Sequence, residues 1–225
     1  MKAGLHLELD ACKLPKNADE VLTAQIAAGL GISEQDLLSY RIVRRSLDAR
    51  KKPHVKLLYQ IVADIREGVV PARMEEPAEE PVPLRIPENR ANVHHPLVIG
   101  SGPAGLFAAL LLAKAGAQPV VIERGRDVER RKQDIDSFFA TRKLNGESNL
   151  LFGEGGAGTW SDGKLYTRIR DPRGGYVLQE FVKAGAQPEI LYYAHPHIGS
   201  DRLPGVIAAI RRQIIALGGK FLWNT

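Results

Sequence analysis

Residues 97–105 read LVIGSGPAG, and this stretch decides the fold of the chain. Its first three residues are apolar and predict a short, buried-type strand, and residues 100–105 match the pattern GxGxxG. The apolar segment 103–114 predicts a helix, and residues 119–122 predict a second buried strand that ends at Glu123. A GxGxxG match alone carries little weight. Here the strand before it, and the helix and second strand after it, form the context that a dinucleotide-binding motif requires.

Each glycine of the motif has a physical role at such a site. Gly100 permits the tight turn, Gly102 lets the backbone approach a pyrophosphate, and Gly105 allows close packing of helix and strand. The helix N-terminus offers free N–H groups and the positive end of its dipole to the phosphates. Glu123 follows Gly105 by 18 residues and can accept hydrogen bonds from ribose hydroxyls. The predicted contacts also include the residues between the glycines, namely Ser101, Pro103 and Ala104.

The residues around the motif bear on which dinucleotide binds. Pro103-Ala104 inside the motif and Glu123-Arg124-Gly125 after the second strand resemble FAD-binding flavoproteins more closely than NAD dehydrogenases. In the alternative, NADP binding, Arg124 contacts the 2′-phosphate. We therefore predict FAD as the cofactor and Arg124 as a further contact.

A second glycine-rich segment covers residues 153–163 and contains five glycines in eleven residues. Such density allows positive φ angles and close approach of the backbone to a flat ligand. The alternative is a flexible surface loop, but Trp160 and the apolar residues 150–152 flank the glycines and favour an ordered one. The predicted cofactor contacts in this segment are Gly155, Gly156, Ala157, Gly158, Thr159, Ser161, Asp162, Gly163 and Lys164.

Residues 148–165, SNLLFGEGGAGTWSDGKL, resemble a family of bacterial FAD-dependent dehydrogenases within the glutathione-reductase-like flavoprotein superfamily. Residues 46–50, SLDAR, and 196–201, PHIGSD, resemble other blocks of that family. The resemblance implies a flavin-dependent oxidoreductase in which the loop 153–164 lies along the pyrophosphate and isoalloxazine of FAD. It leaves the substrate unknown, and NAD(P)H is a candidate electron donor or acceptor.

Members of that family are longer than this chain. They supply a later Gly-Asp segment that closes over the flavin, and a substrate domain. The resemblance therefore implies that the chain is a fragment with an incomplete site. We expect the rest of a parent chain, or an oligomer partner, to complete it, and we expect the fragment alone to be inactive.

The N-terminal part of the chain has a different pattern. Residues 5–9 alternate as in a half-buried strand, residues 21–31 have helical spacing, and two further strands are predicted at 41–47 and 55–65. The order βαββ predicts a small α+β, ferredoxin-like domain over residues 1–70.

The rest of the chain divides into a connector and a second domain. Prolines and glutamates gather in residues 71–95, which predicts a connector, and residues 96–225 are predicted to be the N-terminal part of an FAD-binding Rossmann domain of the α/β class. Later predicted elements are helices at 128–143 and 176–184, a helix capped by Ser200 or Asp201 that ends near Gly218, and a strand from Lys220.

Composition limits the other possibilities. The net charge is +5, and all of the excess lies in residues 96–225, as suits a phosphate-bearing ligand. Cys12 is the single cysteine, so no disulfide can form within the chain and a reducing cytoplasm is expected. The uncharged stretch 97–113 is too short and too rich in glycine to span a membrane. His195 and His197 lack metal-ligand spacing with other donors, so no metal site is predicted, and no catalytic acid or base can be named.

Basic residues suggest an alternative function. A run of seven lies in the N-terminal part and would suit an RNA-modifying flavoprotein; it comprises Arg41, Arg44, Arg45, Arg50, Lys51, Lys52 and Lys56. Residues 1–95 hold 14 basic and 14 acidic residues, so a solvated strand face is favoured over a nucleic-acid interface. A non-catalytic dinucleotide-binding fragment is the other alternative. Six basic residues near the motif are predicted to lie at the surface; they are Lys114, Arg124, Arg126, Arg130, Arg131 and Lys132.

Overall fold

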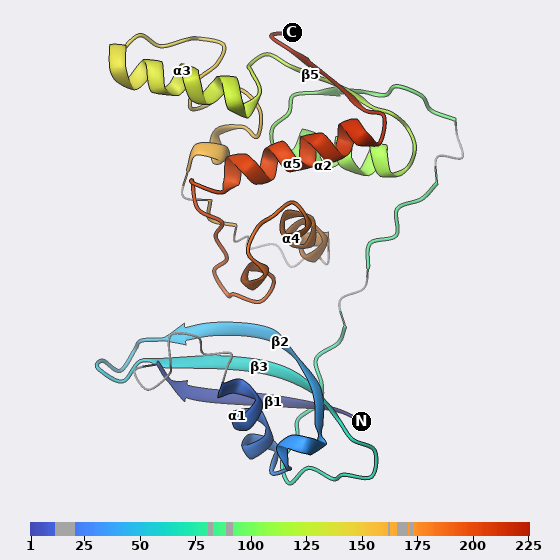
Figure 1. The fold of residues 1–225 in the computed structure, drawn as a ribbon, viewed down its shortest axis with the longest axis vertical. Helices are drawn as coiled ribbons and strands as arrows, with labels where there is room; N and C mark the ends of the chain where they lie inside the picture. Colours follow the sequence, from blue (N-terminus) through green and yellow to red (C-terminus); the bar gives the residue numbers. More distant parts are fainter. Residues whose placement is uncertain (12–20, 81–82, 89–91, 162, 166–170, 172) are drawn as a thin grey trace. The chain divides into compact units, whose positions relative to one another are not determined.

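The computed structural model describes residues 1–11, 21–80, 83–88, 92–161, 163–165, 171 and 173–225 (Figure 1). The chain forms two compact units. Unit 1 comprises Met1–Pro81 together with Tyr192–His195, and unit 2 comprises Val82–Leu191 together with Pro196–Thr225. The division between Pro81 and Val82 lies inside the segment predicted as a connector. Cys12 lies outside the described residues.

In its described residues, unit 1 is a three-stranded antiparallel sheet with one α-helix, in the predicted order βαββ. Its elements are β1 (Lys2–Asp10), α1 (Leu22–Leu30), the short 3-10 helix η3 (Glu34–Asp36), β2 (Leu37–Asp48) and β3 (Lys56–Ile65). The strand order is β1-β3-β2, so β3 lies in the centre. Its likeness to half of a ferredoxin-like sandwich stays a prediction.

The alternation of β3 explains why α1 covers one face of this sheet. Tyr59, Ile61 and Ile65 point to the same side, and each is at most 1% exposed. The apolar stripe of α1, spaced at three to four residues, packs on them, and Gly31 ends the helix with a φ of 69°. Burial of these two stripes forms the core of unit 1.

Two extended segments outside the predicted strands add to the edges of the sheet. Gly4 and Glu75 exchange backbone hydrogen bonds of 2.9 and 2.8 Å, which places the start of the proline-rich segment beside β1. On β2, the Arg45 N–H donates to the Tyr192 carbonyl at 2.8 Å, and the Ala194 N–H donates to the Arg45 carbonyl at 2.9 Å. Periodicity does not predict these pairings, because each involves only a few residues.

Unit 2 contains a parallel sheet in the order β4-β5-β6. Its strands are β4 (Leu97–Ile99), β5 (Val120–Glu123) and β6 (Lys220–Trp223). Its helices are α2 (Pro103–Lys114), α3 (Val128–Thr141), α4 (Arg173–Lys183) and α5 (Leu203–Ala216), with 3-10 helices η4 (Ala157–Trp160) and η5 (Pro188–Leu191). Helix α2 has the predicted bounds, and it packs with α5 in the same core as Val98 and Val121.

The prediction that residues 97–99 form a buried strand was wrong for two of the three side chains. Val98 is 9% exposed, but Leu97 is 59% and Ile99 is 80% exposed. Leu222, in register with Ile99 through β5, is 48% exposed on the same face. The helices therefore bury one face of the sheet and leave this apolar face open, whereas parallel sheets are generally covered on both.

The predicted cap of the last helix was also wrong. Helix α5 begins at Leu203, its N-cap is Arg202, and no side chain caps it. A turn at Gly199 precedes it, with φ of 94°, and the Gly199 carbonyl accepts hydrogen bonds from the N–H groups of Arg202 and Leu203. The backbone turn thus takes the place that we had assigned to Ser200 or Asp201. None of the helices in the described part of the chain is long and apolar enough to cross a membrane.

Candidate dinucleotide site

The two glycine-rich segments lie against each other. The Gly155 N–H donates to the Ser101 carbonyl at 2.8 Å. A Cβ atom placed on Gly156 would lie 3.3 Å from Pro103 Cδ and 3.6 Å from Gly102 Cα. Residues about 50 positions apart in the sequence therefore form one backbone surface at the N-terminus of α2.

The N-terminus of α2 is open. Gly102 is its N-cap, no side chain caps it, and its first turn contains no acidic residue. Gly100 has a φ of 88°, and a Cβ on Gly100 or Gly102 would meet nothing within 4 Å. Gly105 differs, because a Cβ there would lie 1.9 Å from the Gly100 carbonyl oxygen. Gly105 therefore packs against Gly100 with no space for a side chain. The backbone at Gly102, in contrast, has no neighbour in the direction of a Cβ, so an anion can approach it.

Glu123 ties the end of β5 to this turn. Its carboxylate accepts hydrogen bonds from the Ser101 N–H at 2.7 Å, the Ser101 hydroxyl at 2.8 Å and the Gly125 N–H at 2.9 Å. Burial alone would raise the pKa of Glu123, but the hydrogen bonds from Gly125 and Ser101 outweigh it and hold the pKa below the ordinary value. A carboxylate has about four acceptor positions, so the three bonds leave one position of Glu123 unused.

Arg131 was predicted to lie at the surface, and this prediction was wrong. Its side chain is fully buried, and its guanidinium donates four hydrogen bonds to backbone carbonyls. The acceptors are Asn149 at 2.7 Å, Leu150 at 3.0 Å, Glu154 at 2.6 Å and Gly156 at 2.8 Å. Burial lowers the pKa of Arg131 to about 10, so it is still charged at neutral pH.

Helical spacing could have revealed the burial of Arg131. It shares a face of α3 with Val128 and Ile135, three residues before and four after it, and both are buried. Lys114 was likewise predicted at the surface, but its side chain is 19% exposed and its ammonium lies 2.6 Å from the carboxylate of the buried Glu180.

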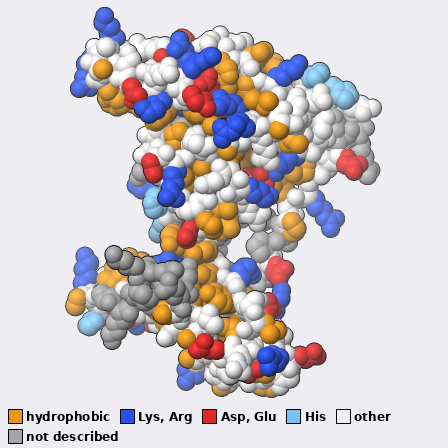
Figure 2. All heavy atoms as spheres, in the orientation of Figure 1, with side chains coloured by type: hydrophobic (Ala, Val, Ile, Leu, Met, Phe, Trp, Pro, Cys, Tyr) orange, Lys and Arg blue, Asp and Glu red, His pale blue; other side chains and the backbone are white. Residues whose placement is uncertain are grey.

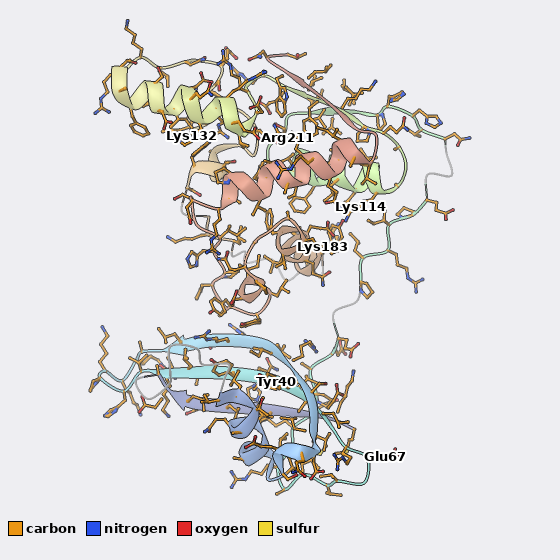
Figure 3. The ribbon with its side chains drawn as sticks, viewed as in Figure 1. Tyr40, Glu67, Lys114, Lys132, Lys183 and Arg211 are labelled. Carbon is orange, nitrogen blue, oxygen red and sulfur yellow. The ribbon has the colours of Figure 1, made fainter. Side chains whose placement is uncertain are left out.

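Glu154 was not predicted as a site residue, and its buried carboxylate lies in an ionic cluster with Arg211 and the more exposed Glu129. Its carboxylate accepts a hydrogen bond of 2.8 Å from the Val128 N–H and lies 3.2 Å from the Arg211 guanidinium. Arg211, which is labelled on α5 in Figure 3, also donates a hydrogen bond of 2.6 Å to Glu129 of α3. Burial raises the pKa of Glu154 to about 7, against the attraction of Arg211. Its position between glycines gave no periodic signal.

The other predicted cofactor contacts in the second glycine segment differ in their solvent exposure. Ala157 and Gly158 are exposed, whereas Thr159 is 1% exposed and its hydroxyl donates to the Glu154 carbonyl. The Ser161 hydroxyl donates to the Gly158 carbonyl. Asp162 lies outside the described residues.

Lys164 and Arg124, which are further predicted cofactor contacts, lie near opposite ends of the second glycine segment and have different surroundings. The exposed Lys164 forms a backbone bridge with His197, which directs residues 163–165 toward the start of α5. At the other end, Arg124 pairs with Glu147 at 2.9 Å and lies 4.4 Å from the centre of the Phe152 ring. Arg124 is therefore placed beside the loop, with more than half of its side chain exposed.

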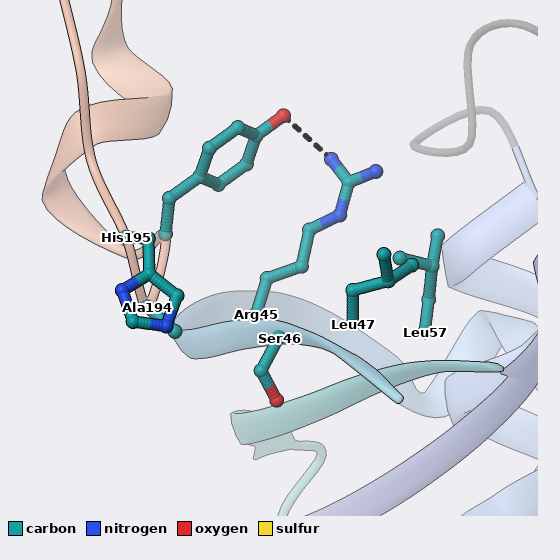
Figure 4. Close-up of a pocket in the computed structure, with 7 residues that line it drawn as sticks. Arg45, Ser46, Leu47, Leu57, Ala194 and His195 are labelled. Atoms are coloured by element: carbon teal, nitrogen blue, oxygen red, sulfur yellow. Dashed lines mark hydrogen bonds between the residues drawn. The ribbon is translucent and has the colours of Figure 1, made fainter. Parts of the chain in front are cut away.

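Unit 1 has a pocket of its own, of about 270 Å³ (Figure 4). In it the Arg45 guanidinium donates to the Tyr193 hydroxyl at 2.7 Å and stacks over the rings of Tyr193 and Tyr59. None of the residues that line it belongs to the glycine segments. Within the described part of the chain, no group of three His, Cys, Asp or Glu residues is arranged to hold a metal ion.

Comparisons with known proteins bear on both units. Residues 94–133 match the family model of an FAD binding domain, and residues 7–64 match that of a domain of unknown function. A protein of Clostridium beijerinckii, described as an uncharacterized protein, is 43% identical over 214 residues. The match covers 91% of this chain and 40% of that protein, so the chain spans less than half of its relative's length. The segment 94–133 holds the glycine turn, α2, Glu123 and Arg131, and its match supports an FAD-binding domain of the flavin-dependent oxidoreductase type.

Proposed function

We propose that this chain supplies the FAD-binding part of a flavin-dependent dehydrogenase. The observation that carries the proposal is the contact of the two glycine segments at the uncapped N-terminus of α2. The first of these segments and α2 lie within residues 94–133, which match an FAD binding domain. A helix N-terminus with bare backbone attracts phosphate through its free N–H groups and its dipole. A Cβ on Gly100 or Gly102 would meet nothing within 4 Å among the described residues, so the backbone there is open to the approach of a pyrophosphate.

In this proposal each part of the site has a separate task. The turn 100–105 binds the pyrophosphate, and the free acceptor position of Glu123 takes a ribose hydroxyl. Arg124 and the loop 155–164 lie along the pyrophosphate and the isoalloxazine. When bound, FAD supplies a ring that accepts or returns a hydride, and NAD(P)H is the proposed partner in that exchange. The chain's own residues bind and orient the cofactor.

A further layer of protein is part of the proposal. The open face with Leu97, Ile99 and Leu222 is apolar, and the relative is much longer than the matched region. We therefore propose that another part of the full-length protein, or a partner subunit, covers this face and contributes the substrate site.

The ion pairs of unit 1 argue against the RNA-modifying alternative. Several of its cations already pair with carboxylates, among them Arg50 with Asp48 and Lys56 with Glu8, both at 2.7 Å. On the face shown in Figure 2, basic and acidic side chains are interspersed. A nucleic-acid backbone binds best where unpaired cations gather.

The absorbance spectrum of the purified full-length protein tests the proposal. We expect flavin bands in the visible range, and FAD as the compound released on denaturation. Release of NAD(H) or NADP(H) alone, with no reconstitution by FAD, would contradict it.

We expect Glu123→Ala to weaken FAD binding by about 1–3 kcal/mol, the range for a hydrogen bond to a charged group. The substitution removes the ribose acceptor and frees the Ser101 N–H from the carboxylate. Titration calorimetry on the deflavinated protein measures the change, and Glu67→Ala, an exposed position in unit 1 (Figure 3), is the control. Equal affinities in the two variants would assign the ribose contact to another residue.

A further inference from the structure

Arg131 sets the direction of the peptide groups in the glycine loop. A trans peptide carries its C=O and the following N–H on opposite sides. The carbonyls of Glu154 and Gly156 point at the guanidinium, so the N–H groups of Gly155 and Ala157 point away from it. The Gly155 N–H meets the Ser101 carbonyl, which places the N–H side of the loop toward the glycine turn.

This direction matters for an anionic ligand. Carbonyl oxygens carry partial negative charge and repel a pyrophosphate, whereas N–H groups attract it. Four carbonyls between Asn149 and Gly156 are turned toward the buried cation instead of the open N-terminus of α2. Without the cation the Glu154 carbonyl would keep only the Thr159 hydroxyl, and the other three carbonyls would lose the guanidinium, so the loop would have to rearrange to satisfy them.

We propose that Arg131 is a positioning residue of the cofactor site. It binds four backbone carbonyls of residues 149–156, holds the glycine loop against the N-terminus of α2 and keeps these carbonyl oxygens away from the pyrophosphate. This inference rests on the proposed function. Arg131 does not touch the cofactor, and its effect passes through the loop backbone.

The four carbonyl acceptors lie in different directions around the side chain, and this arrangement requires an arginine. A guanidinium offers five N–H donors in a fixed plane, and Arg131 uses them on carbonyls from both ends of the loop. A lysine offers three donors at one point. Arg131→Lys therefore keeps the charge but leaves at least one of the four carbonyls without its partner.

The test compares Arg131→Lys with Arg130→Lys in the full-length protein. Arg130 is the neighbouring residue on α3, with 61% of its side chain exposed. FAD affinity is measured by titration on the deflavinated, folded proteins, and amide hydrogen exchange is measured at residues 149–157. We expect Arg131→Lys to bind FAD roughly tenfold or more weakly, the loss of one charged hydrogen bond, and to exchange faster in the loop. Arg130→Lys is expected to match the wild-type protein in both.

A second variant covers the case in which Arg131→Lys does not fold. The buried Asn149 side chain accepts hydrogen bonds from the N–H groups of Leu151 and Phe152 and donates one to the Asn145 carbonyl. Asn149→Ala loosens the same loop without changing a buried charge, and we expect faster loop exchange and weaker FAD binding from it.

The outcomes separate this inference from the proposed function. A wild-type protein that binds no FAD contradicts the proposed function. Wild-type binding, with Arg131→Lys and Arg130→Lys equal in affinity, overturns the role of Arg131 alone. Lower thermal stability of the Arg131→Lys apoprotein with unchanged affinity for FAD also overturns it, because a residue that acts only in folding would give that result. If Arg131→Lys does not fold, Asn149→Ala with wild-type affinity overturns it.

Discussion

Replacing Gly102 by valine is expected to lower FAD affinity by about 100-fold or more, on the order of the 3 kcal/mol that severe overpacking costs, while the fold survives. The Gly102 φ of −64° is accessible to valine, and a Cβ there meets nothing within 4 Å among the described residues, so the backbone conformation and the Cβ position both accept a side chain. The added side chain would instead occupy the space through which a pyrophosphate approaches the N-terminus of α2. Titration of the deflavinated protein with FAD measures the loss, and circular dichroism shows whether the fold is kept.

The chain offers a matched control for this substitution. Gly205 lies in the first turn of α5, and a Cβ there would also meet nothing within 4 Å. Gly205→Val makes the same chemical change at another helix start and is expected to leave FAD binding unchanged. Normal FAD loading in Gly102→Val would remove the phosphate role from the glycine turn. An equal loss in Gly205→Val would show that the effect is not specific to the site.

The protein is expected to lose about 3 kcal/mol of unfolding free energy between pH 4.5 and 8 through Glu154, since each pKa unit corresponds to about 1.4 kcal/mol. Burial raises the pKa of this carboxyl from 4.5 to about 7 in the folded protein. Below pH 4.5 both folded and unfolded states hold the proton. Between pH 4.5 and 7 the folded state must keep a proton that the unfolded state releases, so the stability falls, and above about pH 7 the loss is complete.

Glu154→Gln removes this titration and is expected to flatten the fall in stability. The amide stays neutral at every pH, and Arg211 keeps its ion pair with Glu129. Urea unfolding at several pH values measures the difference, with the exposed Glu147→Gln as the control. If the pH profiles of Glu154→Gln and wild type run parallel, the Glu154 proton is not linked to folding in this range.

The local elements of both units could be predicted from the sequence because their patterns are periodic or punctuated by glycine. The alternation of apolar and polar side chains in residues 55–65 predicted β3, and the apolar run before Gly116 predicted α2. The glycines of residues 100–105 marked a turn, since Gly100 requires positive φ and Gly105 leaves no space for a Cβ. Each of these signals arises within one segment of the chain.

The burial of charged side chains was predicted less well. Hydrophobic periodicity identifies apolar faces, and we assigned arginine, lysine and glutamate to solvent by default. Arg131 and Glu154 are buried because each has its partners in another segment. Arg131 donates to backbone carbonyls of the loop, and Glu154 binds the Val128 N–H and Arg211. Burial of a charge costs free energy unless such partners exist, and their presence cannot be read from the residues beside it.

The sequence by itself determined the strands and helices, the glycine turn and its resemblance to flavoproteins, because these depend on neighbouring residues and on backbone conformation. Only the tertiary structure decided that the second glycine segment lies on the first, that Glu123 already holds Ser101, and that Arg131 orients the loop carbonyls. It also decided that Leu97 and Ile99 face outward, since an apolar pattern does not say on which faces a strand is covered. These features depend on the closure of long loops, and no local pattern encodes which distant groups such closure brings together.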